Sequence, residues 1–576
     1  MRKEIKYLLL IFTLALRSSN VIWANYQEDF KHHFLEGLEL FEQNKLDAAL
    51  TKFKFCAKLS PDNPEPIFYL GRIHEQQDKL INAMDAYENV IKLNPSHFLG
   101  HKYLAGLYYK KNMFRDALKT YNRALQIQPD DSETHYFFGN LFFKLRNYSE
   151  ALTQYDEALR YNQNYAGAYN NKGTVLRLTQ RLKKALHNYN KAVATDPNYA
   201  LAYRNLGLTY QKLKQLDQAE SALKKSLELT PEDTRARFYL ANVYFDRENY
   251  EGAIPEYQAT VKLTPNFGPG YNNLGLCYQR LDRLDQATAA FEKAIRYNPG
   301  NGEIYKNLAD TYLKLGKVEV AQNYYFSALK YDSTLVESHL KLGNIYKSQD
   351  DHLKSIQEYK KVLRADSTNA EAYYKLGVAH FDLTQYEVAV PFLQKTLALN
   401  KNQPKAYLFL GLIFLRNNDF EQAISAFQKA LVLDPEDAEV HYQLGSAYLK
   451  INKEEEAVDQ FKQVVRLEPN HLSAHYNLAQ ALLQLERMEE SKKEMATFHR
   501  LSLQEDEIKK LQRLIPVQPK NPDLNRKLGE IYFNRNEFKA AVEQFEKVLE
   551  LNPQEVGTLE LLERAKLKIR KNQKLN

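Results

Sequence analysis

A strict period constrains the fold of this chain more than any other feature of its sequence. Steps of 34 residues from Gly275, taken in both directions, reach glycine or alanine in fourteen consecutive repeats. No insertion or deletion interrupts them. The positions are Gly37, Gly71, Ala105, Gly139, Gly173, Gly207, Ala241, Gly275, Ala309, Gly343, Gly377, Gly411, Gly445 and Ala479. A fifteenth repeat, with Gly529 in the same role, follows after an insertion. Self-similarity at a period of this length is typical of an array of stacked structural repeats.

The spacing inside one repeat predicts two helices. In the eighth repeat, Gly275 and Tyr278 are three residues apart, and Ala287 and Phe291 are four apart. Each pair therefore lies on one face of a helix. Small residues at Gly275 and Ala287 are expected where the two helices cross closely. A bulky side chain at Ala287 would overpack this crossing, at a cost of about 1–3 kcal/mol.

The helices of the eighth repeat are expected over residues 268–281 and 285–298. Pro299 ends the second helix, because proline cannot continue a helix and disfavours helical backbone before it. Asp285 is expected to cap the start of the second helix. Because one repeat cannot bury its apolar face alone, the repeats must stack into one long array with a continuous core.

The chain resembles the tetratricopeptide repeat (TPR) family from Phe30 to Glu555. In the eighth repeat, the residues that carry the resemblance are Leu274, Gly275, Tyr278, Ala287, Phe291, Ala294 and Pro299. The resemblance implies an all-α, right-handed superhelical solenoid of about fifteen helix pairs, closed by a capping helix. It further implies that the first helix of each pair lines an inner groove, which is the expected place for a partner.

The expected organisation of the chain has five parts. These are a signal peptide at 1–24, an array at 25–505 with fourteen 34-residue repeats from residue 30, an extra or elongated helix and linker at 506–521, repeat fifteen at 522–555, and a capping helix with a basic tail at 556–576.

Residues 1–24 have the pattern of an export signal. A basic start at residues 1–6 precedes the ten-residue apolar run YLLLIFTLAL, and cleavage is expected after Ala24. A membrane span needs about 20 apolar residues, and Arg17 ends this run early. The pattern predicts an exported protein, periplasmic or secreted. The alternative is an uncleaved N-terminal helix that anchors the protein in a membrane.

The remaining composition argues against nucleic acid binding and catalysis. The formal net charge is +7, and residues 1–24 account for +3 of it, which leaves +4 (7 − 3) over more than five hundred residues. Nucleic acid binding favours a strongly basic face. None of the common hydrolase, metalloprotease, nucleotide-binding or dinucleotide-binding motifs occurs. Cys56 and Cys277 lie too many repeats apart to form a bridge. We therefore expect no enzyme activity, no cofactor and no nucleic acid partner.

Histidines recur at the fourth place of the repeat, where the eighth repeat has Tyr271. They are His33, His101, His135, His339, His441 and His475. A metal ladder would need ligands about 2 Å from the ion, whereas neighbouring helix pairs lie about 10 Å apart. Other repeats place tyrosine here, so the position favours a flat amphipathic ring, and no metal site is predicted.

Partner-binding candidates occupy the second, fifth, sixth, ninth, twelfth and thirteenth places of the first helices, counted from Gly268 in the eighth repeat. One group is aromatic, and the alternative for it is packing between helices. Its members in the first four repeats are Phe34, Phe41, Phe68, Tyr69, Tyr103, Tyr109, Phe137 and Phe143, and repeats eleven and twelve add Tyr374 and Phe409. A second group is basic, at the thirteenth place, where a solvated face is the more common role and contact with an acidic partner is the alternative. It includes Lys212, Arg280 and Lys314.

The third group is a row of asparagines at the sixth place: Asn171, Asn205, Asn273 and Asn307. An amide both donates and accepts hydrogen bonds, so a regular row of amides can bind an extended peptide backbone. The row resembles the asparagine ladder in the repeat arm of O-linked N-acetylglucosamine transferases, with Asn477 in a matching place. This chain has no room for a transferase domain, so the resemblance suggests a peptide groove only. The alternative is that asparagine is tolerated on a polar face.

These observations favour a non-catalytic scaffold or adaptor of the cell envelope or the secreted space, with protein or extended peptide partners in the groove. One alternative is a partner subunit that recruits a separate enzyme, such as a glycosyltransferase or a polymer-export machine. Another is a membrane-anchored scaffold that keeps its N-terminal segment. The sequence predicts neither the partner nor the oligomeric state.

Overall fold

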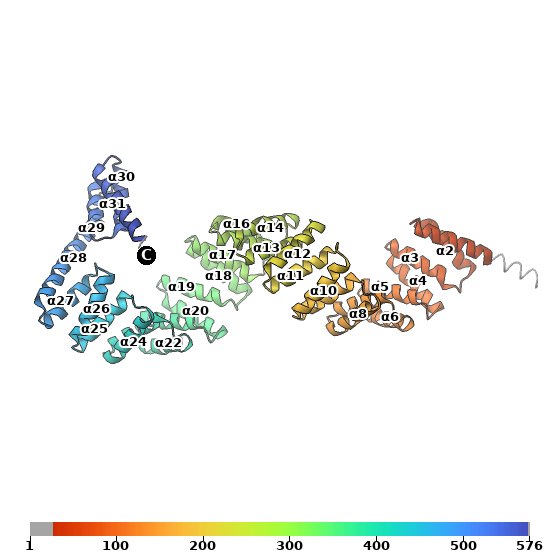
Figure 1. The fold of residues 1–576 in the computed structure, drawn as a ribbon, viewed down its shortest axis with the longest axis horizontal. Helices are drawn as coiled ribbons and strands as arrows, with labels where there is room; N and C mark the ends of the chain where they lie inside the picture. The colour runs from red at the N-terminus through yellow and green to blue at the C-terminus, as the bar shows by residue number, and fades with distance from the viewer. Residues whose placement is uncertain (1–26, 574–576) are drawn as a thin grey trace, which may run out of the picture. The chain divides into compact units, whose positions relative to one another are not determined.

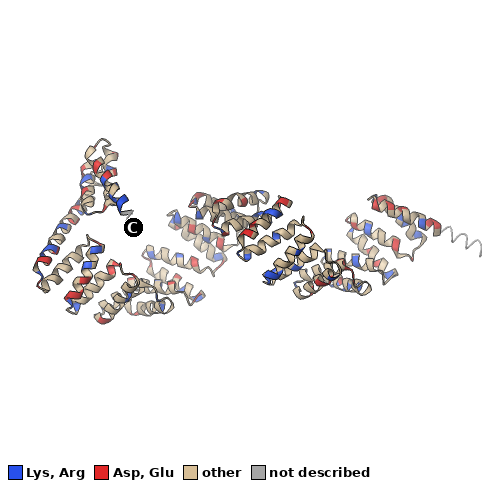
Figure 2. Ribbon diagram, in the orientation of Figure 1, with Lys and Arg blue, Asp and Glu red and all other residues tan. Residues whose placement is uncertain are grey.

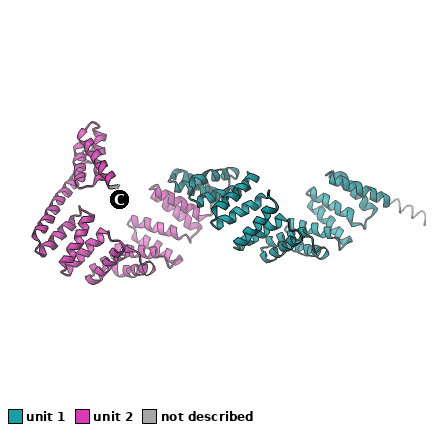
Figure 3. Cartoon of the chain, in the orientation of Figure 1, with its two compact units in different colours: residues 1–299 teal, residues 300–576 magenta. Residues whose placement is uncertain are grey.

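The computed structural model describes residues 27–573, and all regular secondary structure in that range is helical (Figure 1). The chain forms two compact units, residues 1–299 and 300–576 (Figure 3). In each unit, two antiparallel helices make one repeat, and each pair packs on the next pair along the chain. The fold is therefore an all-α solenoid of stacked helix pairs.

In the first compact unit, residues 27–42 are helical and belong to repeat one. The first helices of repeats two to eight are α3 (Pro64–Gln76), α5 (Phe98–Lys110), α7 (Ser132–Lys144), α9 (Ala166–Leu178), α11 (Ala200–Lys212), α13 (Thr234–Asp246) and α15 (Gly268–Arg280). The second helices of repeats one to eight are α2 (Leu46–Leu59), α4 (Leu80–Leu93), α6 (Phe114–Ile127), α8 (Tyr148–Tyr161), α10 (Leu182–Thr195), α12 (Leu216–Leu229), α14 (Tyr250–Leu263) and α16 (Leu284–Tyr297).

The second compact unit continues the same order. Its first helices are α17 (Gly302–Lys314), α19 (Val336–Ser348), α21 (Ala370–Asp382), α23 (Pro404–Arg416), α25 (Ala438–Lys450), α27 (Leu472–Gln484) and α29 (Pro522–Asn534). Its second helices are α18 (Val318–Tyr331), α20 (His352–Ala365), α22 (Tyr386–Leu399), α24 (Phe420–Leu433), α26 (Glu454–Leu467), α28 (Met488–Leu514) and α30 (Phe538–Leu551), and α31 (Val556–Gln573) follows.

Where a repeat has glycine at this place, the glycine accommodates a large side chain from the second helix of the same repeat. A Cβ atom at Gly275 would lie 2.7 Å from Cε1 of Phe291, which is fully buried. Gly173 faces Tyr189 in the same way, at 2.8 Å. Ala287 is fully buried one turn before Phe291. The small residue therefore makes room for a ring of the partner helix, which is how the two helices approach closely.

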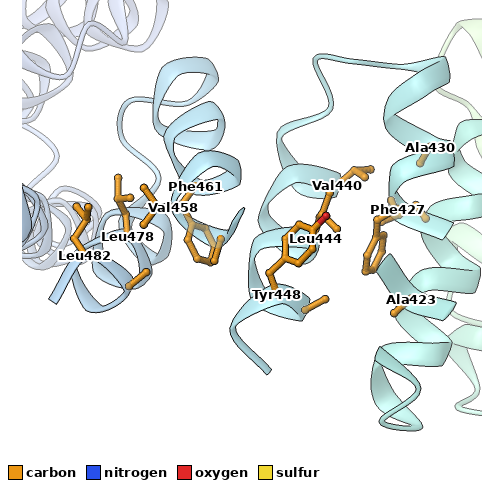
Figure 4. Close-up of a cluster of buried hydrophobic side chains, with 14 residues drawn as sticks. Ala423, Phe427, Ala430, Val440, Leu444, Tyr448, Val458, Phe461, Leu478 and Leu482 are labelled. Atoms are coloured by element: carbon orange, nitrogen blue, oxygen red, sulfur yellow. The ribbon is translucent and has the colours of Figure 1, made fainter. Parts of the chain in front are cut away.

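The core continues from one helix pair to the next. In the second compact unit, Phe427 and Phe461 are fully buried, and Leu444, on α25, lies in the same hydrophobic cluster (Figure 4). This cluster extends from α23 to α27. A single repeat could not bury these side chains, so stability comes from stacking.

The two helices of a repeat are joined by a turn with left-handed backbone. In the eighth repeat Asp282 has φ 57°, and the N–H of Arg283 donates to the carbonyl of Tyr278 at 2.8 Å. This is the Schellman motif, which ends a helix by satisfying its last carbonyl groups. The turn recurs through the array, at residues as different as Asn112, Arg146 and Thr384.

The expected cap by Asp285 is wrong. The N-cap of α16 is Arg283, which makes no side-chain cap, and Asp285 lies inside the first turn. The reason is the tight connection: the residue at the N-cap position of α16 also closes α15 through its N–H. An acidic residue in the first turn still stabilises the helix, because it interacts favourably with the helix dipole. α16 ends at Tyr297, so Pro299 lies just beyond it, as expected.

The end of the array departs from the period. α28 runs without interruption from Met488 to Leu514, so residues 506–514 prolong the second helix of repeat fourteen. α31 packs its buried residues Leu562 and Ala565 at the end of the last repeat, where Leu562 joins Ala541 and Phe545 of α30.

The expected signal peptide, residues 1–24, lies outside the described residues. Among the helices within residues 27–573, none combines the length and the apolar character that crossing a bilayer requires.

Candidate partner-binding surface

A cavity of about 330 Å³ opens on the first helices of repeats two, three and four. Its lining residues are Glu75 of α3, Lys102, Tyr103, Gly106, Tyr109 and Lys110 of α5, Tyr121 of α6, and Glu133, Phe137 and Asn140 of α7. All of them except Tyr121 occupy the places that the sequence assigned to the groove. The structure thus brings predicted groove positions of three successive repeats together around one space.

The charged residues at this cavity form ion pairs with one another. Lys110 Nζ lies 3.0 Å from Glu75 Oε1, and Lys102 Nζ lies 2.6 Å from Glu133 Oε2 and 3.0 Å from Asp131 Oδ2. Burial alone would lower the pKa of Lys102, but hydrogen bonds to Glu133 and Asp131 outweigh it and raise the pKa. Lys102 therefore stays charged, and the two lysines leave little unbalanced charge at the rim. Figure 2 shows basic and acidic residues mixed along the helices.

Four aromatic rings line the cavity, and three of them come from first helices. Tyr103 is held in place by Arg72, whose guanidinium donates to the phenol oxygen at 2.8 Å and lies 4.2 Å from the ring centroid. Tyr109 is half-buried, and burial raises the pKa of its phenol. Phe137 is 39% exposed. Tyr103 and Phe137 were predicted groove residues, and here they face an accessible space.

The remaining aromatic candidates pack mainly between helices. Phe68 is only 2% exposed, with its ring centroid 5.8 Å from that of Tyr87 and 5.6 Å from that of Tyr103. Its fifth-place position points between α3, α4 and α5, so Phe68 is a core residue rather than a groove residue. Phe34 and Tyr69 are half-buried and meet edge to face at 5.8 Å.

In the second compact unit, Tyr374 and Phe409 are half-buried neighbours with ring centroids 6.2 Å apart. Phe381 approaches Phe409 at 5.0 Å. These rings pack between α21 and α23. Part of their surface is therefore buried in the contact between the two repeats.

The asparagine row is bonded within the protein. Asn171 Nδ2 donates to Asn140 Oδ1 at 2.8 Å and to the Tyr136 hydroxyl at 3.1 Å, and its Oδ1 accepts from Asn170 at 3.0 Å. Both donor hydrogens of the Asn171 amide are therefore used between α7 and α9. An amide in this state joins two repeats and offers a peptide only its remaining acceptor capacity.

Other members of the row follow the same pattern. Asn205 is 8% exposed and donates to Asn170 Oδ1 at 2.9 Å. Asn273 donates to Asn242 Oδ1 at 3.0 Å and to the Tyr257 hydroxyl at 3.3 Å. Asn477 donates to the Tyr442 hydroxyl at 3.2 Å. Asn307 is half-buried on α17. In the hydrogen bonds of Asn171, Asn205, Asn273 and Asn477, the amide links neighbouring first helices.

The basic row has a simple local reason. Lys212, Arg280 and Lys314 are exposed, and each is the last residue of its first helix, α11, α15 and α17. A cation at this end interacts favourably with the helix dipole. Lys110 and Arg416 end α5 and α23 in the same way. Helix termination accounts for this spacing without a partner.

The histidine row also has a structural role. His475 Nε2 lies 3.0 Å from the carbonyl of Pro469, and Nδ1 lies 2.6 Å from Glu494 Oε2. His441 makes the same two contacts, with Pro435 and Gln460. The ring ties the first helix to the preceding loop and to the second helix, which explains the flat amphipathic ring expected at this place.

The remaining groups with possible reactivity are two cysteines and a cluster of two histidines and one glutamate. Cys56 and Cys277 are buried free thiols, and burial raises the pKa of Cys277 to about 12. His32, His33 and Glu36 have ligand-type atoms within 4.8 Å of one another. The Glu36 carboxylate is bound by Lys52 at 2.6 Å, so an internal ion pair accounts for its position.

Two features of the cavity were not identified from the sequence. Tyr121 forms part of the wall although it lies on a second helix, and Gly106 leaves the ninth place of α5 without a side chain. The signal was present, because the ninth place has a side chain in every other repeat from one to fourteen. The sequence did not show that the glycine at the ninth place of α5 lies opposite Tyr121, so the signal could not be interpreted.

Family models match most of the described chain. The description "Tetratricopeptide repeat" applies to residues 68–97, 164–232, 204–266, 269–301 and 522–555, and "TPR repeat" to 106–145 and 139–177. A further model, "Cilia and flagella-associated protein 70 C-terminal domain", matches residues 301–514. The chain is a helical-repeat protein of the class used as scaffolds, and it belongs to the tetratricopeptide repeat family.

Solved TPR structures are similar to this chain. The Cut9 and Hcn1 hetero-tetramer of the APC/C is 17% identical over 93% of this chain and 96% of that chain, with a TM-score of 0.35. YrrB, described as a TPR protein with an unusual peptide-binding site, is 28% identical over 33% and 98%, with a TM-score of 0.31. MamA is 32% identical over 29% and 92%, with a TM-score of 0.28. No curated protein sequence matches the chain.

Proposed function

We propose that this chain is a non-catalytic scaffold that holds an extended segment of another protein against the inner places of its first helices. The observation that carries the proposal is the cavity between α3, α5 and α7, which is lined by inner places of three successive repeats. A linear segment is the partner shape that such a row of equivalent helices fits best. The ion pairs at the rim leave the aromatic rings to supply most of the binding energy.

The binding segment is expected at the aromatic stretch rather than at the asparagine row. The amide donors of Asn171 and Asn273 already bond Asn140 and Asn242, so a peptide backbone would have to displace those bonds. Phe137 and Tyr109 require no such exchange. We therefore expect the main contact in repeats two to four and a stacking role for the asparagines.

Site-specific photo-crosslinking in the native cell tests this proposal. A photoreactive phenylalanine analogue at Phe137 or Tyr109 should capture a defined partner, identified by mass spectrometry. The same analogue at Lys119, an exposed residue on the second helix α6, should not. Equal capture from all three positions would contradict binding at the inner places.

The location of the protein is part of the proposal. The signal-like pattern in residues 1–24 supports export to the cell envelope or the secreted space. Intact-mass measurement of the protein from its native source decides between export and anchoring. A mass that still includes residues 1–24 would favour the membrane-anchored alternative.

A further inference from the structure

The second helices of many repeats carry a buried tyrosine whose hydroxyl is satisfied by the ninth place of the same repeat. Tyr155 donates to Asn140 Oδ1 at 2.8 Å, and Tyr359 donates to Asn344 Oδ1 at 2.8 Å. Further pairs of this kind are Tyr189 with Thr174, Tyr257 with Asn242, and Tyr325 with Asp310. The pairing is a regular device for satisfying a buried hydroxyl.

Repeat three breaks this pairing. Tyr121 is the equivalent tyrosine and is 2% exposed, but the ninth place opposite it is Gly106. A Cβ atom at Gly106 would already lie 3.8 Å from the Tyr121 hydroxyl, so the ring keeps its usual position. Among the described residues, none forms a hydrogen bond with that hydroxyl. Tyr121 therefore presents a hydroxyl with no hydrogen-bond partner among the described residues to the cavity of about 330 Å³.

The surroundings of this hydroxyl define the chemistry of an occupant. The walls are the rings of Tyr103, Tyr109 and Phe137, which favour another aromatic ring in an edge-to-face or offset arrangement. The rim lysines are paired with Glu75 and Glu133, so the cavity supplies no free charge for an ionic group. The occupant should be a neutral ring with one polar atom at its tip.

We propose that this cavity binds a tyrosine side chain of the extended partner segment, with the partner's phenol meeting the Tyr121 hydroxyl. The proposal rests on the proposed function, because it assumes that a segment lies along the inner places. The partner's phenol would replace water as the partner of the Tyr121 hydroxyl, whereas phenylalanine would displace that water and leave the hydroxyl buried and unpaired. Leaving a buried polar group unpaired is the stronger source of discrimination.

Small aromatic probes test the cavity without knowledge of the partner. Binding of p-cresol and toluene, which represent the tyrosine and phenylalanine side chains, is measured on the full chain by saturation-transfer nuclear magnetic resonance. We expect p-cresol to bind about tenfold more tightly than toluene. In Tyr121→Phe the two probes should bind within about twofold of each other, since the hydroxyl on the wall is lost.

Two substitutions at Gly106 provide the matched controls. Gly106→Asn gives Tyr121 the pairing that Asn140 and Asn344 provide elsewhere and fills the cavity, so p-cresol binding should be lost. Gly106→Ala fits at 3.8 Å and should keep it. Circular dichroism verifies that each variant is folded.

Three results would overturn the proposal: no probe binding, which means a cavity that holds water only; equal binding of p-cresol and toluene to the unmodified chain; or unchanged p-cresol binding in Gly106→Asn. The crosslinking at Phe137 is independent of all three. Partner capture without p-cresol binding would reject the tyrosine pocket and keep the scaffold, whereas p-cresol binding without capture would reject the scaffold.

Discussion

Between α3 and α7 the inner places carry Tyr103, Tyr109 and Phe137 and enclose a cavity, whereas between α7 and α11 the same places carry asparagines that bond one another. We refer to these as the aromatic stretch and the amide stretch. Both lie in the first compact unit and share the same helix geometry. The amides satisfy each other across the gap between repeats, whereas no described residue of the aromatic stretch forms a hydrogen bond with the Tyr121 hydroxyl. The same scaffold therefore closes one stretch and leaves the other open.

The largest expected effect compares two glycines, one from each stretch. A Cβ atom at Gly173 would lie 2.8 Å from the Tyr189 ring, whereas at Gly106 it would meet only the Tyr121 hydroxyl at 3.8 Å. We expect Gly173→Ala to destabilise its repeat by about 1–3 kcal/mol through overpacking. Gly106→Ala should stabilise its repeat by about 0.5–1 kcal/mol, because glycine is unfavourable inside a helix.

Hydrogen exchange of peptides from α5, α6, α9 and α10 measures both effects locally, which matters because long arrays do not unfold in two states. Shifts of the same sign in the two variants would remove the distinction between an open and a closed stretch.

The next effect concerns the amide bonds. Asn171→Ala removes two donated hydrogen bonds and leaves Asn140 and Tyr136 with fewer partners. The expected loss is about 1–2 kcal/mol, measured as faster hydrogen exchange in α7 and α9. Asn190→Ala, at an exposed position of α10, is the control and should change stability by less than about 0.5 kcal/mol. A loss at Asn171 no larger than at Asn190 would show that the amide row does not fasten the repeats.

The stability of the two stretches should also differ in its dependence on pH. Burial raises the pKa of Asp131, but hydrogen bonds from Thr134 and Lys102 outweigh it and hold the pKa below its ordinary value. As the pH falls, Asp131 is therefore protonated in the unfolded chain before it is protonated in the folded chain. The contribution of Asp131 is present above the unfolded pKa of about 3.9 and is lost as pH falls through the lower folded value. The bonds between asparagines do not titrate.

The check is hydrogen exchange of peptides from α5 and α7, measured on the unmodified chain and on Asp131→Asn at pH 7 and pH 3. Asparagine keeps the N-cap of α7 but loses the ion pair, so we expect a difference of about 1 kcal/mol at pH 7. The difference should shrink at pH 3. A gap that is constant with pH would mean that Asp131 acts only as a cap.

The smallest effect should be equal in the two stretches. Arg146 lies in the turn that ends α7, the last helix of the aromatic stretch, and Gln180 lies in the turn that ends α9, in the amide stretch. Both have left-handed backbone, with φ of 59° and 60°. Glycine adopts this conformation without strain but loses more entropy on folding. Arg146→Gly and Gln180→Gly should each raise the stability of their repeat by about 0.5 kcal/mol, measured by hydrogen exchange of peptides from α7 to α10. Gly316→Ala, at φ 72°, is the reverse control and should lower it. Unequal shifts would place part of the difference between the stretches in their turns.

The helices could be predicted closely from the period alone. Residues 268–281 and 285–298 were expected, and the structure has Gly268–Arg280 and Leu284–Tyr297. The cap at Asp285 was wrong because the spacing gives no information on how tightly a turn is closed. The fifth-place ring of Phe68 was assigned to the groove because its burial depends on the next helix pair.

The sequence by itself determined the array: a repeated small residue on the first helix faces a repeated large side chain on the second, and local spacing decides that contact within one repeat. Only the tertiary structure decided the state of the polar groups. Asn171 reaches Asn140 and Tyr136 across 31 and 35 residues, and such bonds form only when repeats stack. The same stacking leaves Tyr121 opposite Gly106, because a hydroxyl is satisfied by what lies near it in space and not by its place in a period.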